Sequence, residues 1–136
     1  MIAGLGTDIV EIQRIRAIIK RRGHVFVSRI FTVAEREYCS RASDSTARFA
    51  GRFAAKEAVL KALGTGLRGM RWQDVEITRN EEGKPSVRLH GGAAQIAEKQ
   101  GITHIHLSIS HSRDYALAYA IAWQKGEDAN ACRPAE

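Results

Sequence analysis

One long helix is the feature that most constrains how this chain of 136 residues can fold. Ser43, Asp44 and Ser45 are residue types that cap helix N-termini, and an apolar pattern of helical period follows them as far as Leu63. Gly64 is then the residue type that most often ends a helix in the left-handed conformation. The residues predicted to form the inner face of this helix are Phe49, Phe53, Leu60 and Leu63. We therefore expect a long central helix against which the other elements pack.

The residues before this helix predict one strand and two shorter helices. Residues 2–10 are apolar and contain two glycines, which indicates a buried strand with a close backbone approach. Isoleucines recur at helical spacing over residues 11–22, and Gly23 is the predicted end of that helix. A Thr-Val-Ala-Glu capping box then opens a short helix over residues 33–42.

The residues after the long helix predict a hairpin, a helix and a second hairpin. Strands are expected over residues 75–79, 86–89, 104–110 and 115–123, and a helix over residues 93–100. This order favours the α+β class, with a small antiparallel sheet packed against the long helix and shorter helices, over a parallel βαβ array. We expect a single domain over residues 1–123, followed by a polar C-terminal tail over residues 124–136.

The composition restricts the partners and the compartment. Lys and Arg number 21 and Asp and Glu 15, so the net charge is +6. This favours acidic partners: nucleic acid, anionic lipid, a phosphorylated small molecule or an acidic protein. Cys39 and Cys132 are the only cysteines and form no CxxC motif, which argues against a disulfide framework and fits a reducing cytoplasm. No apolar stretch approaches the roughly 20 residues of a membrane span, and no signal peptide is expected.

Glu57 and Lys61 lie one turn apart on the predicted long helix, and so on one face of it. One interpretation is an ordinary ion pair, worth roughly 0.2–0.5 kcal/mol. The other is a site for a phosphate-bearing ligand, because Arg52 and Lys56 add positive charge to the same helix and a glycine-rich turn, residues 64–66, follows it. In that case side chains and a metal ion must attract the anion, since the C-terminal end of a helix dipole repels it.

Asp8 is an acid within an otherwise apolar strand, where burial is costly unless the carboxylate is paired or binds a metal. One alternative is that Asp8 caps the helix that starts near Glu11. The other is that it joins Glu57 in holding Mg²⁺, which binds few carboxylates and takes phosphate oxygens as further ligands. Two carboxylates and the ammonium of Lys61 are the groups needed to hold magnesium on a diphosphate and to neutralise the oxygen that leaves.

Histidines near the C-terminal strands are further candidates. His111 stands where a predicted strand becomes a turn, a usual place for ligand contacts, and a surface histidine at a hairpin end is the alternative. His104 and His106 share one strand face, but no third residue has the spacing of a zinc site. The chain has neither a GxGxxG nor a GxxxxGK motif, so it shows neither of these phosphate-binding patterns.

A basic face is predicted on the first helix. Arg14, Ile18, Arg21 and Arg22 share this face at helical spacing, while the other isoleucines point to the opposite side. The pattern indicates a docking surface for an acidic helix, and the alternative is a solvated charged face. Exposed arginines act over a Debye length of about 8 Å at physiological salt, so they would mainly raise the rate of encounter.

Four segments carry a resemblance to a known family, in the order that the family has them. They are GLGTDIVEIQRI, RFAGRFAAKEAVLKALGTG, NEEGKP and LSISHSRDYALAYAIA. On these residues the chain resembles the holo-acyl-carrier-protein synthases, which are the short 4′-phosphopantetheinyl transferases. The resemblance covers nearly all of the chain up to about Trp123, and FAAKEAVLKALGTG is its most specific part.

The resemblance implies the 4′-phosphopantetheinyl transferase fold and a cytoplasmic enzyme of fatty acid biosynthesis. Such an enzyme transfers 4′-phosphopantetheine from coenzyme A to a serine of apo acyl carrier protein and releases adenosine 3′,5′-bisphosphate. It would hold Mg²⁺ at the positions matching Asp8 and Glu57 and contact the phosphates through Lys61. These three are the expected catalytic groups. The base for the serine hydroxyl would be Glu57, directly or through a metal-bound water, with Asp8 as the alternative.

The resemblance also implies binding surfaces. The positions expected to bind coenzyme A are Arg52, Lys61, Gly64, Thr65, Gly66, Gly83, Lys84, Pro85 and His111. Those expected to bind the acidic carrier protein are Arg14, Ile18, Arg21 and Arg22. The family forms trimers with the site between neighbouring subunits, so we expect a homotrimer, with no nucleic-acid or membrane partner. A small basic RNA- or DNA-binding domain is the alternative that the net charge supports, but the chain lacks aromatic residues interleaved on a basic strand face.

Overall fold

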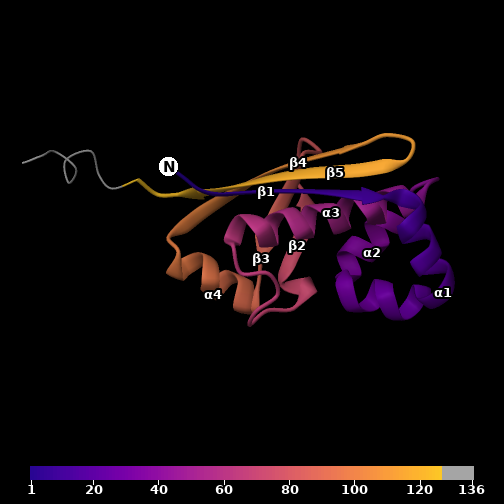
Figure 1. The fold of residues 1–136 in the computed structure, drawn as a ribbon, viewed down its shortest axis with the longest axis horizontal. Helices are drawn as coiled ribbons and strands as arrows, with labels where there is room; N and C mark the ends of the chain where they lie inside the picture. Colours follow the sequence, from indigo (N-terminus) through magenta and orange to yellow (C-terminus); the bar gives the residue numbers. More distant parts are fainter. Residues whose placement is uncertain (127–136) are drawn as a thin grey trace, which may run out of the picture.

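Two antiparallel sheets and four helices make up residues 1–126, the part of the chain that the computed structural model describes (Figure 1). In chain order the elements are β1 (Ile2–Glu11), α1 (Ile12–Ile30), α2 (Val33–Ser40), α3 (Ser45–Leu63), the 3-10 turn η1 (Trp72–Asp74), β2 (Val75–Arg79), β3 (Pro85–Leu89), α4 (Gly91–Lys99), β4 (Ile102–His111) and β5 (Tyr115–Gln124). The predicted α+β class is confirmed. Most of the predicted tail, residues 127–136 with Cys132, lies outside the described residues.

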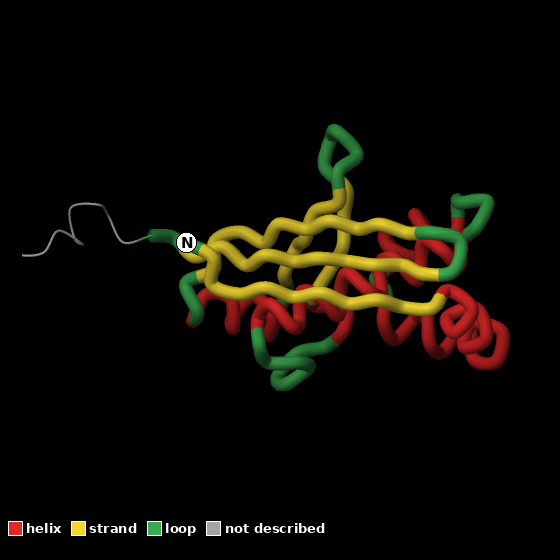
Figure 2. Tube along the Cα trace, turned by 45° about the horizontal axis from the view of Figure 1, so that its top comes forward, coloured by secondary structure: helices red, strands yellow, loops and turns green. Residues whose placement is uncertain are grey.

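β1, β5 and β4 form a three-stranded sheet with β5 in the centre, and the strands lie side by side (Figure 2). Asp8 pairs with Ala118 of β5, and Ala118 pairs with Ile109 of β4. Successive side chains of a strand point to opposite faces, and one face of β5 carries only alanines from residue 116 to residue 122. These buried alanines are Ala116, Ala118, Ala120 and Ala122. Their short side chains allow a helix to lie close to the sheet.

α3 is that helix, and it packs against all three strands of the sheet (Figure 1). Its predicted ends are confirmed: the Asp44 side chain accepts a hydrogen bond from the Ala47 N–H over 3.2 Å, and Gly64 ends the helix at φ 77°. The predicted inner-face residues Phe49, Leu60 and Leu63 are buried in the core, and Phe53 is partly buried against it. The long helix is therefore the central element, as the sequence predicts.

α1 consists of two helical segments joined at a kink. The backbone leaves the helical conformation at Arg22, where φ is −137° and ψ is 29°, one residue before the predicted end at Gly23. The sequence therefore predicts the end of the first segment but not the second segment, which continues to Ile30. This second segment packs Phe26 and Val27 against the core and buries Ile30 in it. The predicted Thr-Val-Ala-Glu capping box does open α2.

β2 and β3 form the predicted hairpin as a separate two-stranded sheet. The Asn80 side-chain oxygen accepts hydrogen bonds from the N–H groups of Glu82 and Lys84, over 3.0 and 2.9 Å, which stabilises the turn. The turn also needs Gly83, whose φ is 82°. None of the helices in residues 1–126 has the length and apolar character that a bilayer crossing would require.

Large apolar side chains cover the face of the three-stranded sheet that points away from α3, which we call the open sheet face. All helices of the described chain lie on the other side of this sheet (Figure 1). Its most exposed apolar members include Leu5, Ile9, Tyr119 and Trp123, which are between 41% and 63% exposed. A contiguous apolar surface of this kind is typical of a protein–protein interface.

Candidate active site

β1 approaches α3 most closely at two glycines. A β-carbon at Gly4 or at Gly6 would lie 1.9 or 1.8 Å from a carbonyl oxygen of α3, a distance that no side chain tolerates. Asp8 lies on the same face of the strand as Gly6, because side chains two residues apart point the same way. The close backbone contact therefore brings the Asp8 carboxylate beside Glu57 and Lys61 on the helix.

Lys61 pairs with Asp8 and not with Glu57. Its ammonium donates hydrogen bonds to Asp8 Oδ1 over 3.2 Å and to the Thr7 carbonyl oxygen over 2.9 Å. Within the described residues Glu57 has no ion-pair partner, so the ordinary pair between Glu57 and Lys61 is wrong. The helix-cap alternative for Asp8 is wrong as well, because α1 begins after Glu11 with no side-chain cap.

The environment of Glu57 disfavours its charged form. Partial burial raises the pKa of Glu57 above the usual value of a glutamate, and the negative charge of Asp8 raises it further, while Lys61 opposes both. A cation placed between the two carboxylates would remove this cost. The donor set suits Mg²⁺, since it consists of two carboxylates from different elements with room for phosphate oxygens. Residues 1–126 hold no cluster of three or more His, Cys, Asp or Glu that could bind a metal on their own.

Asp8, Glu57 and Lys61 line a cavity of about 330 Å³ together with Arg14 and Ile18 of α1, which we call the α1-side cavity. Its other lining residues are Ile9, Val10, Glu11, Ile15 and Phe53. Arg21 and Arg22 follow on α1 as exposed residues outside this lining. One cavity is thus lined by the two carboxylates, by the Lys61 ammonium and by Arg14 and Ile18, which are the first two residues of the predicted docking face.

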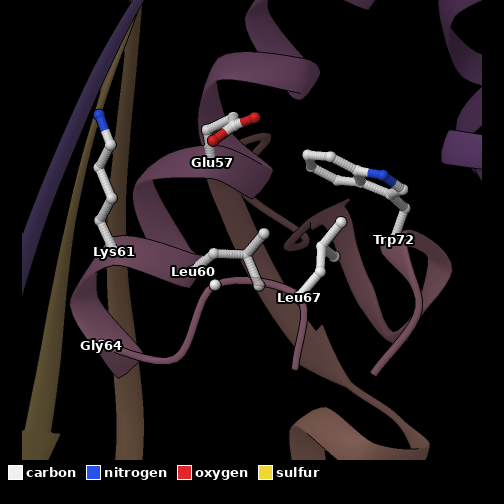
Figure 3. A pocket seen from close by; sticks show the side chains of 7 residues that line it. Glu57, Leu60, Lys61, Gly64, Leu67 and Trp72 are labelled. Carbon is white, nitrogen blue, oxygen red and sulfur yellow. The ribbon is translucent and has the colours of Figure 1, made fainter. Parts of the chain in front are cut away.

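A second cavity, of about 470 Å³, adjoins the first because Glu57 and Lys61 line both. Its other walls are Leu60, Gly64, Gly66, Leu67 and Trp72 (Figure 3). We call it the Trp72 cavity. Sequence reasoning predicts its glycines but misses Leu67 and Trp72, which stand beyond the helix in a segment without a periodic pattern. Their apolar type next to a glycine-rich turn is the only indication in the sequence.

The C-terminal half of α3 exposes little except the candidate groups. From Ala54 to Leu63 every residue is buried apart from Glu57 and Lys61. A helix that is buried nearly all round gains most of its stability from packing, so polar residues on it need a specific reason. The two polar side chains that reach solvent here are those that line both cavities.

Lys56 and Arg52 do not join this site. Lys56 is fully buried, forms an ion pair with Glu35 over 2.9 Å and donates to the Trp72 carbonyl oxygen over 3.1 Å. Burial lowers the pKa of Lys56, and the Glu35 charge opposes that shift. The interpretation of Lys56 as part of a phosphate-attracting cluster is therefore wrong. Arg52 is 6% exposed, and its guanidinium lies 3.9 Å from the centre of the Tyr38 ring.

Other predicted coenzyme A residues lie in separate places of the single chain. His111 lines a third cavity, of about 510 Å³, with Arg41, Arg48 and Arg113. The hairpin turn carries Gly83, Lys84 and Pro85, and the last two line a fourth cavity with residues of β4 and β5. Thr65 lies between the two glycines of the Trp72 cavity. One copy of the chain does not bring all these residues to the two acids.

Comparisons with known proteins give a consistent result. Residues 4–120 match the family model described as the 4′-phosphopantetheinyl transferase superfamily. The chain is 52% identical over 118 residues to a holo-[acyl-carrier-protein] synthase of Caldanaerobacter subterraneus, covering 87% of this chain and 92% of that protein. It is 49% identical over 122 residues to the protein of the same name from Koribacter versatilis, with 89% and 98% covered.

Solved structures agree with the sequence relatives. The holo-[acyl-carrier-protein] synthase of Neisseria meningitidis superposes with a TM-score of 0.85 at 38% identity, over 91% of this chain and 100% of that chain. The Helicobacter pylori protein of the same name, solved in complex with coenzyme A, gives a TM-score of 0.76 at 31% identity, over 88% and 99%. The match thus extends over nearly the whole length of both partners.

Proposed function

The chain belongs to the 4′-phosphopantetheinyl transferase superfamily, and we propose that it is a holo-[acyl-carrier-protein] synthase. In this proposal it transfers 4′-phosphopantetheine from coenzyme A to a serine of apo acyl carrier protein, releases adenosine 3′,5′-bisphosphate and supports fatty acid biosynthesis in the cytoplasm. The observation that carries the proposal is the α1-side cavity. There the carboxylates of Asp8 and Glu57 and the ammonium of Lys61 meet the basic face of α1.

The residues of this cavity have distinct roles in the proposed reaction. The attacking serine hydroxyl must lose a proton, and the Glu57 carboxylate is the base, because it lines this cavity and has no ion-pair partner within the described residues. Negative charge develops on the oxygens around the transferred phosphorus and on the leaving group. Lys61, already held at the strand by Asp8 and Thr7, supplies positive charge there.

Asp8 and Glu57 would hold the magnesium ion that this family is expected to use. Two carboxylates are few ligands for a metal, but they suit Mg²⁺, whose remaining positions are taken by phosphate oxygens and water. When bound, the ion would neutralise charge on the diphosphate of coenzyme A. Holding it would also offset the repulsion between the two carboxylates, which helps raise the pKa of Glu57.

The basic face of α1 is the proposed docking surface for the acidic carrier protein. Arg14 and Ile18 line the α1-side cavity, so a helix seated on them would deliver its serine next to Glu57. Arg21 and Arg22 continue the face outward as exposed cations. Complementary charge of this kind speeds encounter and sets orientation more than it adds affinity.

A homotrimer explains why the remaining coenzyme A residues lie apart in one chain. The cavity with His111, Arg41 and Arg48 is rich in cations and suits a phosphate group of coenzyme A, and the hairpin turn at Gly83–Pro85 suits the nucleotide. Association through the open sheet face would bury its apolar side chains. The proposed site then lies between subunits, with Asp8 and Glu57 from one and His111 from its neighbour.

Incubation with coenzyme A, Mg²⁺ and apo acyl carrier protein, read by intact-protein mass spectrometry, tests the proposal. The carrier protein should gain the mass of one phosphopantetheine, and the gain should disappear when the metal is chelated. A carrier protein whose acceptor serine is changed to alanine is the control and should gain nothing. An unchanged mass for the normal carrier protein, under conditions where another member of the family modifies it, would refute the function.

A further inference from the structure

Two histidines lie among the apolar side chains of the open sheet face. His104 and His106 of β4 stand opposite Trp123 and Ile121 of β5. Leu107, the next residue of β4, is buried in the core beneath the sheet, so the alternation of the strand directs both imidazoles away from α3. Both histidines are exposed in the single chain. Association through the open sheet face would therefore remove two ionisable groups per chain from water.

The two imidazoles are close enough to influence each other. Their ring centres lie 6.2 Å apart, and the ring planes differ by 14°. This separation is shorter than the Debye length of about 8 Å at physiological salt, so a proton on one ring disfavours a proton on the other. The hydrogen-bond contact found for this pair within residues 1–126 is neutral, since His104 Nδ1 lies 3.2 Å from the hydroxyl oxygen of Thr103.

The surroundings of the two imidazoles supply no negative charge. The residues that share a cavity with His104 are all uncharged. His106 shares a cavity with one charged residue, Lys84 of the turn between β2 and β3, and with the phenol of Tyr119. The N-terminal ammonium, which donates to the Gln124 carbonyl oxygen over 2.9 Å, and Lys125 add positive charge at the same end of the sheet. Every nearby charge thus disfavours a protonated imidazole.

The acidic residues of the described strands are too far away or on the other face. Asp8 faces α3, and Glu11 is the one acid that strand alternation places on the open sheet face. Glu11 pairs with Tyr115, eight residues along β5 from the position opposite His104, which corresponds to roughly 26 Å. His90 shows the contrasting arrangement, because its Nε2 lies 3.1 Å from a Glu76 carboxylate oxygen.

These observations make the charge of the two histidines decisive for association. Histidine in water gains its proton near about pH 6.5, so neutral rings can pack against Trp123 and Ile121 above this pH. Below it, the trimer would enclose charged imidazoles without counter-ions in an apolar interface, which is strongly unfavourable. We propose, on the basis of the trimer proposed above, that His104 and His106 form a pH-sensitive switch whose protonation separates the subunits and so dismantles the site between them.

Sedimentation of the whole chain tests the switch directly. The wild type should be a trimer at about pH 8 and a folded monomer at about pH 5.5, and it should reassemble when the pH is raised again. Because a trimer contains two such histidines from each chain, several protons are taken up on dissociation and the transition should be steep. Circular dichroism checks that the separated chains stay folded. A wild type that remains a trimer at about pH 5.5 would overturn the inference.

A double variant separates these histidines from other acid-sensitive groups. His104→Gln combined with His106→Gln stays uncharged and should remain a trimer at about pH 5.5, whereas His24→Gln, at an exposed position of α1, should dissociate like the wild type. The ratio of transfer activity at about pH 5.5 to that at about pH 8 should be roughly 10-fold higher in the double variant than in the wild type. Dissociation of the double variant together with the wild type would overturn the inference. A trimer that dissociates as expected but transfers nothing at about pH 8 would instead count against the proposed function.

Discussion

Lys61 Nζ lies 3.2 Å from Oδ1 of Asp8, a residue 53 positions earlier in the chain, although Glu57 is only one helical turn away. The contact joins α3 to β1 at the rim of the α1-side cavity. Because the Lys61 side chain is 54% exposed, such a pair adds little stability, about 1 kcal/mol or less. Its effect is to keep a positive charge beside the two acids and to leave the Glu57 carboxylate free of an ion pair within the described chain.

Replacing Glu57 with glutamine should abolish transfer while the fold survives. The variant keeps the size of the side chain but loses the base and one of the two carboxylates proposed to hold magnesium, so a loss of more than about 100-fold in kcat is expected. Mass spectrometry of the carrier protein measures transfer, and circular dichroism checks the fold. Near-normal turnover in the presence of magnesium would mean that Glu57 is neither the base nor a metal ligand.

The same variant should be more stable than the wild type at neutral pH when metal is chelated. Since the pKa of Glu57 is raised in the folded state, its contribution to stability is greatest below the unfolded pKa and is lost as pH rises through the folded pKa. Glutamine has no carboxyl group to ionise, so the variant does not lose this stability as the pH rises. Its melting temperature should therefore be higher than that of the wild type at pH 7 and equal to it near about pH 4. Added Mg²⁺ should stabilise the wild type, by about 2.7 kcal/mol at 100 times its Kd, and not the variant. A lower melting temperature for the variant at pH 7 would contradict the assigned cause.

Arg14→Glu should raise the KM for the carrier protein by at least about 10-fold and change the KM for coenzyme A little. Reversing a charge on the docking face turns attraction to an acidic helix into repulsion, which costs more than the loss of the attraction alone. Lys20→Glu is a matched control, because Lys20 is exposed on the same helix but outside the basic face. Equal changes in both KM values, or an equal effect of Lys20→Glu, would show that this face does not bind the carrier protein.

Gly6→Ala should destabilise the protein and lower the folded fraction. The new β-carbon would lie 1.8 Å from a carbonyl oxygen of α3, so β1 must move away at a cost of about 1–3 kcal/mol. That movement would carry Asp8 away from Glu57. Gly23→Ala is the contrasting variant, since its β-carbon would meet only Ile19 at 3.5 Å, and it should be neutral or slightly stabilising. Urea denaturation measures both, and an unaffected Gly6→Ala would be inconsistent with this packing.

Ile9→Asp should dissociate the proposed trimer. Ile9 is 62% exposed on the open sheet face, so a charge there costs little in a monomer but is unfavourable in an apolar interface. Sedimentation equilibrium should give three chains for the wild type and one for the variant. Activity should fall in proportion to the fraction of trimer that is lost, because the proposed site lies between subunits. Val33→Asp, at an exposed apolar residue of α2, should remain a trimer. A monomeric wild type, or a variant that stays assembled, would exclude this face as the interface.

Local patterns predict much of this structure. Asp44 and Gly64 mark both ends of α3 correctly, because caps depend on the chemistry of one or two residues. The break in α1 at Arg22, next to the predicted end at Gly23, also follows a local signal. The helical segment that continues from there to Ile30 has a different origin, because it depends on the tertiary packing of Phe26, Val27 and Ile30. Whether a chain resumes a helix after such a break depends on what the residues beyond it can bury.

The candidate site is predictable only in its residue types. Asp8, Glu57 and Lys61 attract notice because charged groups on apolar elements are costly, and they do lie on one cavity. Spacing along one helix predicts a pair between Glu57 and Lys61. Lys61 pairs with Asp8 instead, and this pairing depends on how closely β1 approaches α3. Lys56 is misjudged for the same reason, since its partner Glu35 comes from another helix. Pairing across elements is set by packing, which no single segment contains.

The nearly complete burial of α3 between Ala54 and Leu63 decides what a mutational scan of this helix would report. Substitutions at the enclosed positions would lower the amount of soluble enzyme, and activity per molecule would be a poor guide to their role. At Glu57 and Lys61 expression should hold while turnover collapses. A screen that records abundance and product formation separately would therefore identify the chemical groups of this helix without any structural information.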